Sequence, residues 1–334
     1  MEMKWSDRVE CLKKLIKEKI MVLDGGMGTE IQALGLRSED YYGEEFESLR
    51  NKAQQAQKEL KGNHDVLSLT RPEIIFEIHS RFLKAGADIV ETNTFSSTGI
   101  VQAEYGLEKV VDRLNAESAR IARRACDAYT ASDPEMRLTF VAGSIGPTNK
   151  SCSMSSVLDR PAERSVTYDE LVETYVEQVT ALLREGCVDM LLVETVFDTL
   201  NCKAALFAAQ QVLRDPSFPC VPLLVSATIS NLNGRTLSGQ TVQSFCISVE
   251  HASPFAVGLN CSWGPADLSQ HLQVVAATTD SAVLVYPNAG LPNALGTYDL
   301  SPDDMAHYIV LSNFAHEQLR NQRPRRKLPW QFLG

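Results

Sequence analysis

Seven short hydrophobic runs recur along the chain, and each is almost continuously apolar rather than alternating between apolar and polar positions. They are Ile20–Asp24, Asp88–Glu91, Thr139–Gly143, Met190–Glu194, Leu223–Ala227, Phe255–Asn260 and Ala282–Tyr286. A strand that is apolar on both faces is buried on both faces, as in a parallel sheet covered by helices. The pattern therefore predicts seven parallel strands.

The segments between these runs carry apolar residues at helical spacing. They are Pro72–Lys84, Val110–Tyr129, Asp169–Arg184, Asn201–Leu213, Thr241–Glu250 and Ala266–Ala276. The first of them begins with a proline, which is favoured in a first helical turn, and gathers His79 with apolar residues on one side. We interpret these stripes as packing faces.

Repeated strand–helix alternation predicts either a doubly wound sheet or a (β/α)8 barrel. Polar or small residues stand at or just after the strand ends, namely Asp24, Glu91, Gly143, Glu194, Asn260 and Asn288. A ring of such residues from many strands is typical of the active face of a TIM-type barrel, whereas an open sheet concentrates its site in one crevice. The sequence therefore favours an α/β fold of the (β/α)8 TIM-type barrel class.

The composition is that of an ordinary soluble protein of 334 residues, with 44% hydrophobic and 22% charged residues. The formal net charge of −10 argues against binding of nucleic acid through its phosphates. No apolar run has the ~20 residues that a membrane-spanning helix needs. The first residues, Met1–Asp7, show no signal peptide, so we expect a cytoplasmic protein with no membrane or nucleic-acid partner.

Eight cysteines are scattered along the chain without a CxxC pair. Such spacing indicates reduced thiols rather than a disulfide framework. Most are expected to be small buried hydrophobic residues. They are Cys11, Cys126, Cys152, Cys187, Cys202, Cys220, Cys246 and Cys261.

A glycine-rich turn, Asp24–Thr29, follows the first predicted strand. Glycines let a backbone approach a ligand closely, and successive N–H groups can hold an anion. The same sequence also suits a tight turn without a ligand, and its spacing is not that of a phosphate loop.

Together with four other segments, this turn resembles the homocysteine S-methyltransferase family. The segments are Leu23–Thr29, Glu91–Phe95, Ala142–Pro147, Val193–Thr195 and Gly258–Cys261. Three more look closest to the N-terminal homocysteine-binding module of one member, cobalamin-dependent methionine synthase: Leu60–Asp65, Thr236–Thr241 and Pro287–Asn293. The resemblance covers roughly Ile20 to Met305 and implies a (β/α)8 barrel.

The resemblance also implies a zinc ion held by three thiolates, which activates the thiol of homocysteine for methyl transfer to give methionine. One thiolate follows the sixth strand, and here it would be Cys261; two adjacent cysteines follow the eighth strand, and this sequence has no adjacent cysteine pair. The methyl donor of the full-length relatives is methylcobalamin, supplied by modules that are absent from this chain.

The similarity fades near Met305, so we expect a barrel domain at 1–305 and a divergent basic tail at 306–334. We expect a helix to Arg320 and then the basic run Asn321–Lys327, as in a truncated or differently ended first module. No eighth strand is recognisable, although Tyr308–Leu311 is apolar enough to be one. A missing eighth strand would leave two barrel edges unpaired.

By the same resemblance, Asp24 and Glu194 would bind the ammonium of homocysteine. Backbone N–H groups of Gly25, Gly26 and Met27, and those from Ser144 to Gly146, would take its carboxylate. Asn260 would orient Cys261 or line the pocket. Glu91 and Thr94 are weaker candidates, expected behind the residues that touch the substrate.

Replacement zinc ligands are hard to find in the sequence. Cys202 lies near the start of a helix at the correct end of the barrel, Cys246 lies in mid-helix, and His307 and His316 do not share a helical face. Two hypotheses therefore stay open: a methionine synthase-like methyltransferase impaired by loss of the cysteine pair, and a non-catalytic protein that binds homocysteine weakly or binds a protein partner. A stand-alone methyltransferase using S-methylmethionine fits the family, and a barrel lyase fits only the fold.

Overall fold

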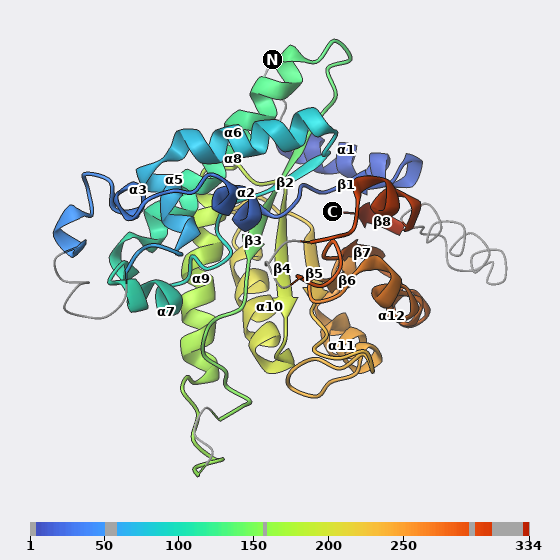
Figure 1. The fold of residues 1–334 in the computed structure, drawn as a ribbon. Coiled ribbons are helices and arrows are strands. Elements are labelled where there is room, and N and C mark those ends of the chain that lie inside the picture. Colours follow the sequence, from blue (N-terminus) through green and yellow to red (C-terminus); the bar gives the residue numbers. More distant parts are fainter. Residues whose placement is uncertain (1–4, 51–58, 156–158, 294–297, 309–329, 334) are drawn as a thin grey trace.

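In the part of the chain that the structure describes, eight parallel strands form one sheet at the centre of the computed structural model (Figure 1). The described residues are 5–50, 59–155, 159–293, 298–308 and 330–333. The strands are β1 (Met21–Val22), β2 (Ile89–Glu91), β3 (Phe140–Ile145), β4 (Met190–Val196), β5 (Leu223–Ala227), β6 (Ala256–Asn260), β7 (Ala282–Tyr286) and β8 (Trp330–Leu333). All seven predicted strands are confirmed.

The sheet returns on itself as a barrel. Its strands lie in the order β1-β8-β7-β6-β5-β4-β3-β2, and β1 continues into a parallel bridge between Leu23 and Ile89 of β2. Two backbone hydrogen bonds close this last seam, from Asp24 N to Ile89 O at 2.9 Å and from Asp88 N to Val22 O at 2.7 Å. The predicted (β/α)8 TIM-type barrel is therefore the fold of this chain.

The eighth position of the barrel is filled by the four residues Trp330–Leu333, which pair with β7 on one side and β1 on the other. The two unpaired edges expected from the sequence are thus absent among the described strands. The strand is short, and its register against β7 shifts between Val283 and Leu284. The other segment considered for the eighth strand was Tyr308–Leu311. Its first residue, Tyr308, is helical, so the prediction is wrong there, and its other three residues lie outside the described part of the chain.

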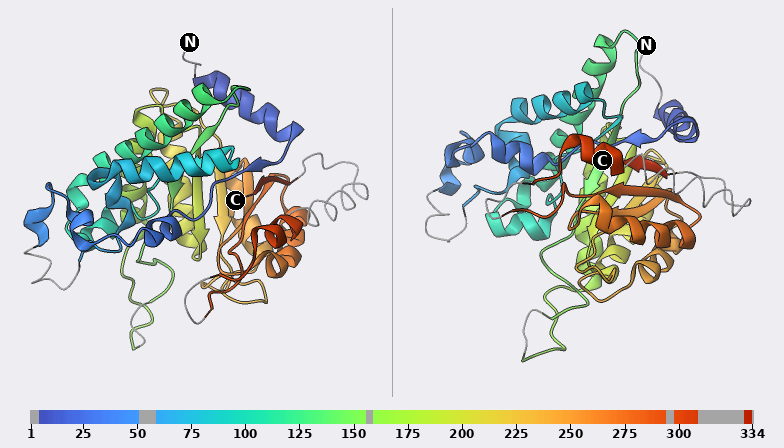
Figure 2. Two further views of the ribbon diagram at one scale, coloured as in Figure 1. Left: turned by 45° about the horizontal axis from the view of Figure 1, so that its top comes forward. Right: turned by 45° about the vertical axis from the view of Figure 1, so that its right-hand side comes forward.

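Helices cover the outside of the barrel (Figure 2). The longer ones are α1 (Trp5–Glu18), α6 (Pro72–Ala85), α8 (Val111–Ser132), α9 (Tyr168–Arg184), α10 (Thr199–Leu213), α11 (Val242–Val249) and α12 (Pro265–Thr278). Shorter α-helices are α2 (Met27–Ala33), α3 (Ser38–Tyr42), α5 (Leu67–Thr70) and α7 (Gly99–Gln102). Single 3-10 turns are η1 (His64–Val66), η2 (Ala103–Tyr105), η3 (Glu108–Val110) and η4 (Glu250–Ala252).

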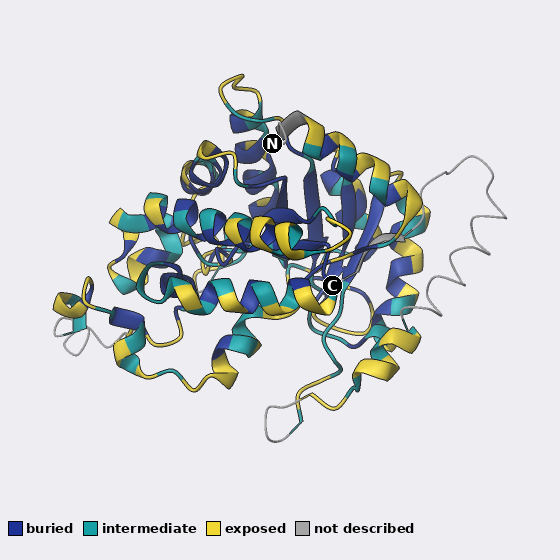
Figure 3. Ribbon diagram, turned by 90° about the horizontal axis from the view of Figure 1, so that it is seen from above, coloured by how far each residue is buried: buried dark blue, intermediate teal, exposed yellow. Residues whose placement is uncertain are grey.

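Strands β2 to β7 are almost wholly buried, and the exposed residues of the helices lie on their outer sides (Figure 3). The six predicted helices are confirmed as α6 and α8 to α12. The expected tail helix lies mostly within residues 309–329, and the expected basic run lies wholly within them; this range is outside the described part of the chain. The boundary at 305/306 stays a prediction. None of the helices described here is both long and apolar enough to cross a bilayer.

Buried ion pairs hold the amino ends of the strands. Asp189, just before β4, accepts from Arg8 Nε of α1 at 2.7 Å and from Arg123 NH1 of α8 at 2.9 Å. Asp88, just before β2, pairs with Lys19 at 2.6 Å. Ion pairs therefore occupy the charged side chains at this end of the barrel. We look for polar residues that could bind a ligand at the opposite end, where the strands have their carboxyl ends.

Candidate functional site

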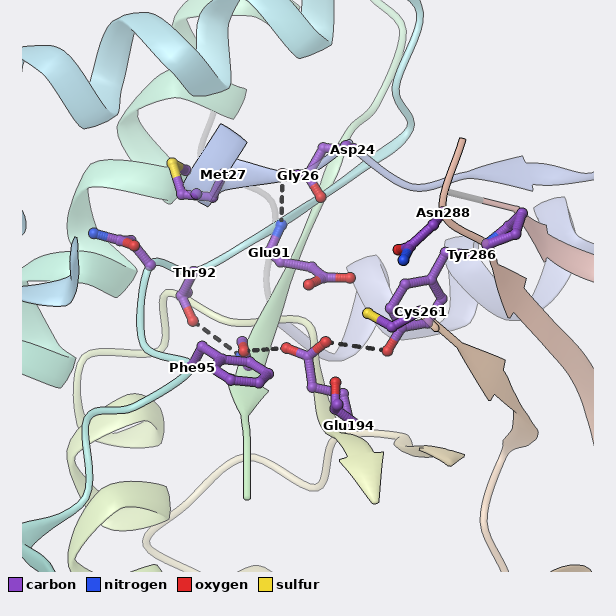
Figure 4. Close-up of a pocket in the computed structure, with 16 residues that line it drawn as sticks. Asp24, Gly26, Met27, Glu91, Thr92, Phe95, Glu194, Cys261, Tyr286 and Asn288 are labelled. Carbon is purple, nitrogen blue, oxygen red and sulfur yellow. Dashed lines mark hydrogen bonds between the residues drawn. The ribbon is translucent and has the colours of Figure 1, made fainter. Parts of the chain in front are cut away.

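A cavity of about 330 Å³ opens at the carboxyl ends of the strands. Figure 4 shows three acidic side chains and one cysteine sulfur directed into it. Its lining residues are Asp24, Gly25, Gly26, Met27, Gly28, Glu91, Thr92, Asn93, Phe95, Ser144, Glu194, Thr195, Cys261, Tyr286, Pro287 and Asn288. Residues from β1, β2, β3, β4, β6 and β7 or the turns after them thus meet in one place, as the barrel prediction requires.

The three carboxyl groups are those of Asp24, Glu91 and Glu194. Burial raises the pKa of each, and for Asp24 and Glu91 the negative charge of Glu194 raises it further. The pKa of Glu194 rises to about 6. Three carboxyl groups this close together in a small buried cavity repel one another when they are ionised. A bound cation relieves this repulsion, so the cavity is well suited to a cationic group.

Glu194 is held in place by two hydroxyl donors. Ser144 Oγ of β3 donates to Oε1, and Tyr286 OH of β7 donates to Oε2 at 3.2 Å. The same two hydrogen bonds act against burial and keep the pKa of Glu194 from rising further. The Tyr286 hydroxyl also lies against Ser226 Oγ of β5. The carboxylate therefore has a fixed orientation before any ligand arrives.

Cys261 follows β6 and is oriented by its neighbour. Asn260, fully buried, donates to Cys261 Sγ at 3.1 Å and to Thr195 Oγ1 at 2.8 Å. Its Oδ1 accepts from Thr195 N at 3.1 Å and from Ser226 Oγ at 2.8 Å. Burial and the charge of Glu194 raise the pKa of the Cys261 thiol to about 11, so it is a neutral thiol at pH 7.

Backbone strain is concentrated beside this thiol. Thr195, Cys261 and Ser262 have positive φ angles of 54°, 55° and 61°. Residues with a Cβ rarely adopt this conformation, and such strain gathers at functional sites. The hydrogen bond from Cys261 N to Tyr286 O at 3.1 Å helps to hold the strained turn.

The glycine turn lies on the opposite wall of the cavity. A Cβ on Gly25 would lie 2.8 Å from Phe82 Cε1 of α6, and one on Gly26 would lie 2.8 Å from Thr29 Oγ1. The turn therefore needs glycine for close packing. At Gly26 the chain enters α2 without a side-chain cap, which leaves backbone N–H groups at the cavity wall.

The segment before α5 anchors the loop that follows β2. Asp65 Oδ2 accepts from Ser96 N and from Ser97 Oγ, each at 2.7 Å. Asn93, which lines the cavity, donates to His64 O at 2.9 Å. The loop that carries part of the cavity wall is thus tied to a buried carboxyl group.

The Asp65 anchor predicts a pH dependence of stability. Burial raises the pKa of Asp65 from 3.8 to about 6. The neutral Asp65 carboxyl group is favoured in the folded protein, because burial disfavours its ionised form. The stabilisation that this gives to the folded state is fully present below pH 3.8 and is lost as the pH rises through 6. We expect the unfolding free energy of Asp65→Asn, relative to the natural protein, to rise by about 3 kcal/mol across this window.

Urea unfolding of both proteins at several pH values measures this difference. Asp215→Asn is the matched control, because Asp215 lies at the surface and its pKa is lowered by hydrogen bonds from Ser217. A difference that stays constant from pH 4 to pH 7 would refute the assignment to Asp65.

The structure brings most of the predicted site residues together. Eight residues were predicted to bind the substrate or the metal. Seven of them line the cavity, and the eighth, Asn260, lies directly behind Cys261. Thr94 is buried against Ser144 O, away from the cavity. Glu91, expected behind the substrate-contacting residues, lines the cavity itself. Their roles in binding stay predictions.

Sequence reasoning missed Tyr286. It ends the seventh apolar run, where an aromatic residue is typical of a hydrophobic core. In the structure, its hydroxyl group points toward Glu194. Its position at a strand's carboxyl end was the available signal. Phe95, from the loop after β2, was likewise missed as a lining residue.

The residues present do not fit the zinc site that the resemblance implies. A zinc-thiolate site with an open position needs three protein ligands, and Cys261 is the single cysteine of the cavity lining. All eight cysteines lie in the described part of the chain, where no group of three His, Cys, Asp or Glu residues is placed to hold a metal ion. Cys202 is buried in the core and lines a separate small cavity beside Asp198.

Fold and site together define a (β/α)8 barrel with an acidic, thiol-bearing pocket at its mouth. The sequence profile of the homocysteine S-methyltransferase family matches residues 21–320, and the chain belongs to that family.

Solved structures of the homocysteine methyltransferase MmuM from Escherichia coli share the fold. The oxidized form is 21% identical, with a TM-score of 0.65 over 97% of this chain and 93% of that one. The metallated form is 22% identical, with a TM-score of 0.66 over 90% of this chain and 99% of that one. The apo form is 22% identical, with a TM-score of 0.59 over 87% of this chain and 95% of that one.

Proposed function

We propose that the cavity binds homocysteine by its amino-acid end and that this chain, by itself, transfers little or no methyl to it. One observation carries both parts: the cavity holds three carboxyl groups but a single thiol. The first feature suits the ammonium of an amino acid. The second falls short of the ligand set that would activate its sulfur.

The amino-acid end is assigned as follows. Asp24 and Glu194 bind the ammonium, and Glu91 completes the acidic wall that favours a cation. Ser144 N already donates to Thr92 Oγ1 at 3.0 Å, and its hydroxyl donates to Glu194. The substrate carboxylate is therefore assigned to the N–H groups of the Gly25–Met27 turn.

The sulfur end explains the expected lack of activity. Methyl transfer to sulfur needs the thiolate, and a free thiol has a pKa of ~8.5. Zinc would deprotonate the thiol outright, but the described residues do not provide its ligands. Acidic neighbours in a buried cavity disfavour the thiolate further, as the raised pKa of Cys261 illustrates.

Zinc content and turnover test the proposal together. We expect calorimetry to show homocysteine binding by the purified, chelator-washed protein, with well under one zinc per chain and no methionine formed from homocysteine and methylcobalamin. Cys261→Ser is the matched variant and should behave in the same way. One zinc per chain that is lost in Cys261→Ser, together with methionine formation, would overturn the proposed inactivity.

A further inference from the structure

A buried histidine lies behind the acidic wall of the cavity. His79 of α6 has no exposed surface, and neither of its ring nitrogens has a hydrogen-bond partner. A buried polar group left unpaired costs about 1–3 kcal/mol, so such groups in folded proteins call for an explanation. Sequence reasoning placed this residue on a packing face and gave it no further role.

The neighbour of His79 on the cavity side is Asp24. His79 Nδ1 lies 4.0 Å from Asp24 Oδ2, and both side chains are almost fully buried. A hydrogen bond between nitrogen and oxygen spans about 2.7–3.2 Å, so a movement of about 1 Å would join them. Asp24 Oδ2 at present accepts from Glu91 N at 3.1 Å.

Helix α6 is fixed against the turn that carries Asp24. One turn beyond His79, Phe82 contacts Gly25 so closely that a Cβ there would lie 2.8 Å from its ring. Arg81 of the same helix pairs with Glu30 of α2 at 2.6 Å. Helix α6 is therefore fixed behind the Asp24 carboxyl group, and the gap of 4.0 Å between His79 Nδ1 and Asp24 Oδ2 is left for the side chains to close.

We propose that His79 is a positioning residue for Asp24, donating its Nδ1–H to the carboxylate when an amino-acid ammonium is bound in the cavity. The inference rests on the proposed binding of homocysteine. A buried carboxylate that faces an ammonium must be ionised, and an ionised carboxylate gains more from an additional donor than a neutral one. The structure supports a neutral imidazole for this role, because burial lowers the pKa of His79 to about 4.

Ligand selectivity separates this role from simple packing. The probes are L-homocysteine and 4-mercaptobutanoic acid, which is the same molecule without the amino group. His79→Leu removes both ring nitrogens, and His79→Asn keeps an N–H donor near the place of Nδ1. We expect His79→Leu to weaken binding of homocysteine about 10- to 100-fold, the value of a hydrogen bond to a charged group, and to leave 4-mercaptobutanoic acid unaffected.

Two further results are expected. His79→Asn should bind homocysteine nearly as the natural protein does. In an Asp24→Asn background, His79→Leu should have no additional effect on homocysteine binding, since the carboxylate through which it acts is gone. Thermal unfolding should show His79→Leu to be as stable as the natural protein or more so, because it removes unpaired polar atoms.

The outcomes discriminate between the two proposals. Equal weakening of both ligands in His79→Leu, or no weakening of either, would overturn the role of His79 while leaving homocysteine binding in place. A natural protein that does not bind homocysteine, or binds it no better than 4-mercaptobutanoic acid, would overturn both.

Discussion

Replacing Glu194 with glutamine is expected to weaken homocysteine binding by about 100-fold, since removing one partner of a buried, hydrogen-bonded charge pair costs about 2–5 kcal/mol. The carboxylate is oriented by Ser144 and Tyr286 and faces the cavity. Glutamine keeps the size of the side chain and an oxygen for one of these donors, but it removes the charge. Calorimetric titration at pH 7.5, above the Glu194 pKa of about 6, measures the loss.

Glu173→Gln is the matched control for this experiment. Glu173 lies on the exposed side of α9 and does not line the cavity. It should leave the dissociation constant unchanged. Equal affinity of Glu194→Gln and the natural protein would show that the ammonium is bound elsewhere, and the proposed orientation of the substrate would fall.

Replacing Gly258 with alanine is expected to cost about 4 kcal/mol or more in the free energy of unfolding, through overpacking that has no room to relax. Gly258 of β6 pairs with Leu284 of β7. A Cβ at Gly258 would lie 1.7 Å from Leu284 O and 2.5 Å from its carbonyl carbon. Because the obstacle is backbone in a paired strand, relief requires the two strands to separate.

Gly28→Ala provides the comparison for chemical unfolding. Gly28 lies in α2, and a Cβ there would meet its nearest atom, His64 Cδ2, at an ordinary 3.7 Å. Alanine is the better helix former by about 1 kcal/mol, so this variant should be as stable as the natural protein or slightly more so. Similar unfolding curves for Gly258→Ala and Gly28→Ala would show that β6 and β7 tolerate a wider spacing.

The barrel could be predicted because seven of its strands are continuously apolar and bounded by polar turns. The eighth could not. Its four residues, Trp330–Leu333, follow a basic run and are too few to show a period. Their place in the sheet depends on pairing with β7 and β1, which are distant along the chain. Pairing between distant segments leaves little trace in a local pattern.

The candidate site could likewise be predicted only in part from the sequence. Asp24, Glu194 and Cys261 could be located because each stands at or just after a strand's carboxyl end, where barrel sites form. Tyr286 also ends a strand, but an aromatic residue after four apolar ones is typical of core. His79 occupies a helical packing face, and only the three-dimensional structure shows that its ring lies 4.0 Å from a carboxyl oxygen of the cavity.

The pairing of β1 with β8 has a consequence for biosynthesis. Met21 lies opposite Phe332, a contact between residues more than three hundred positions apart. A ribosome adds about 5–20 residues per second, so β1 waits on the order of tens of seconds for the strand that completes its pairing. During this interval β1, and in its last seconds β7 as well, has an edge without its partner strand, and it is then that a chaperone that shields strand edges would matter most to the yield of the barrel.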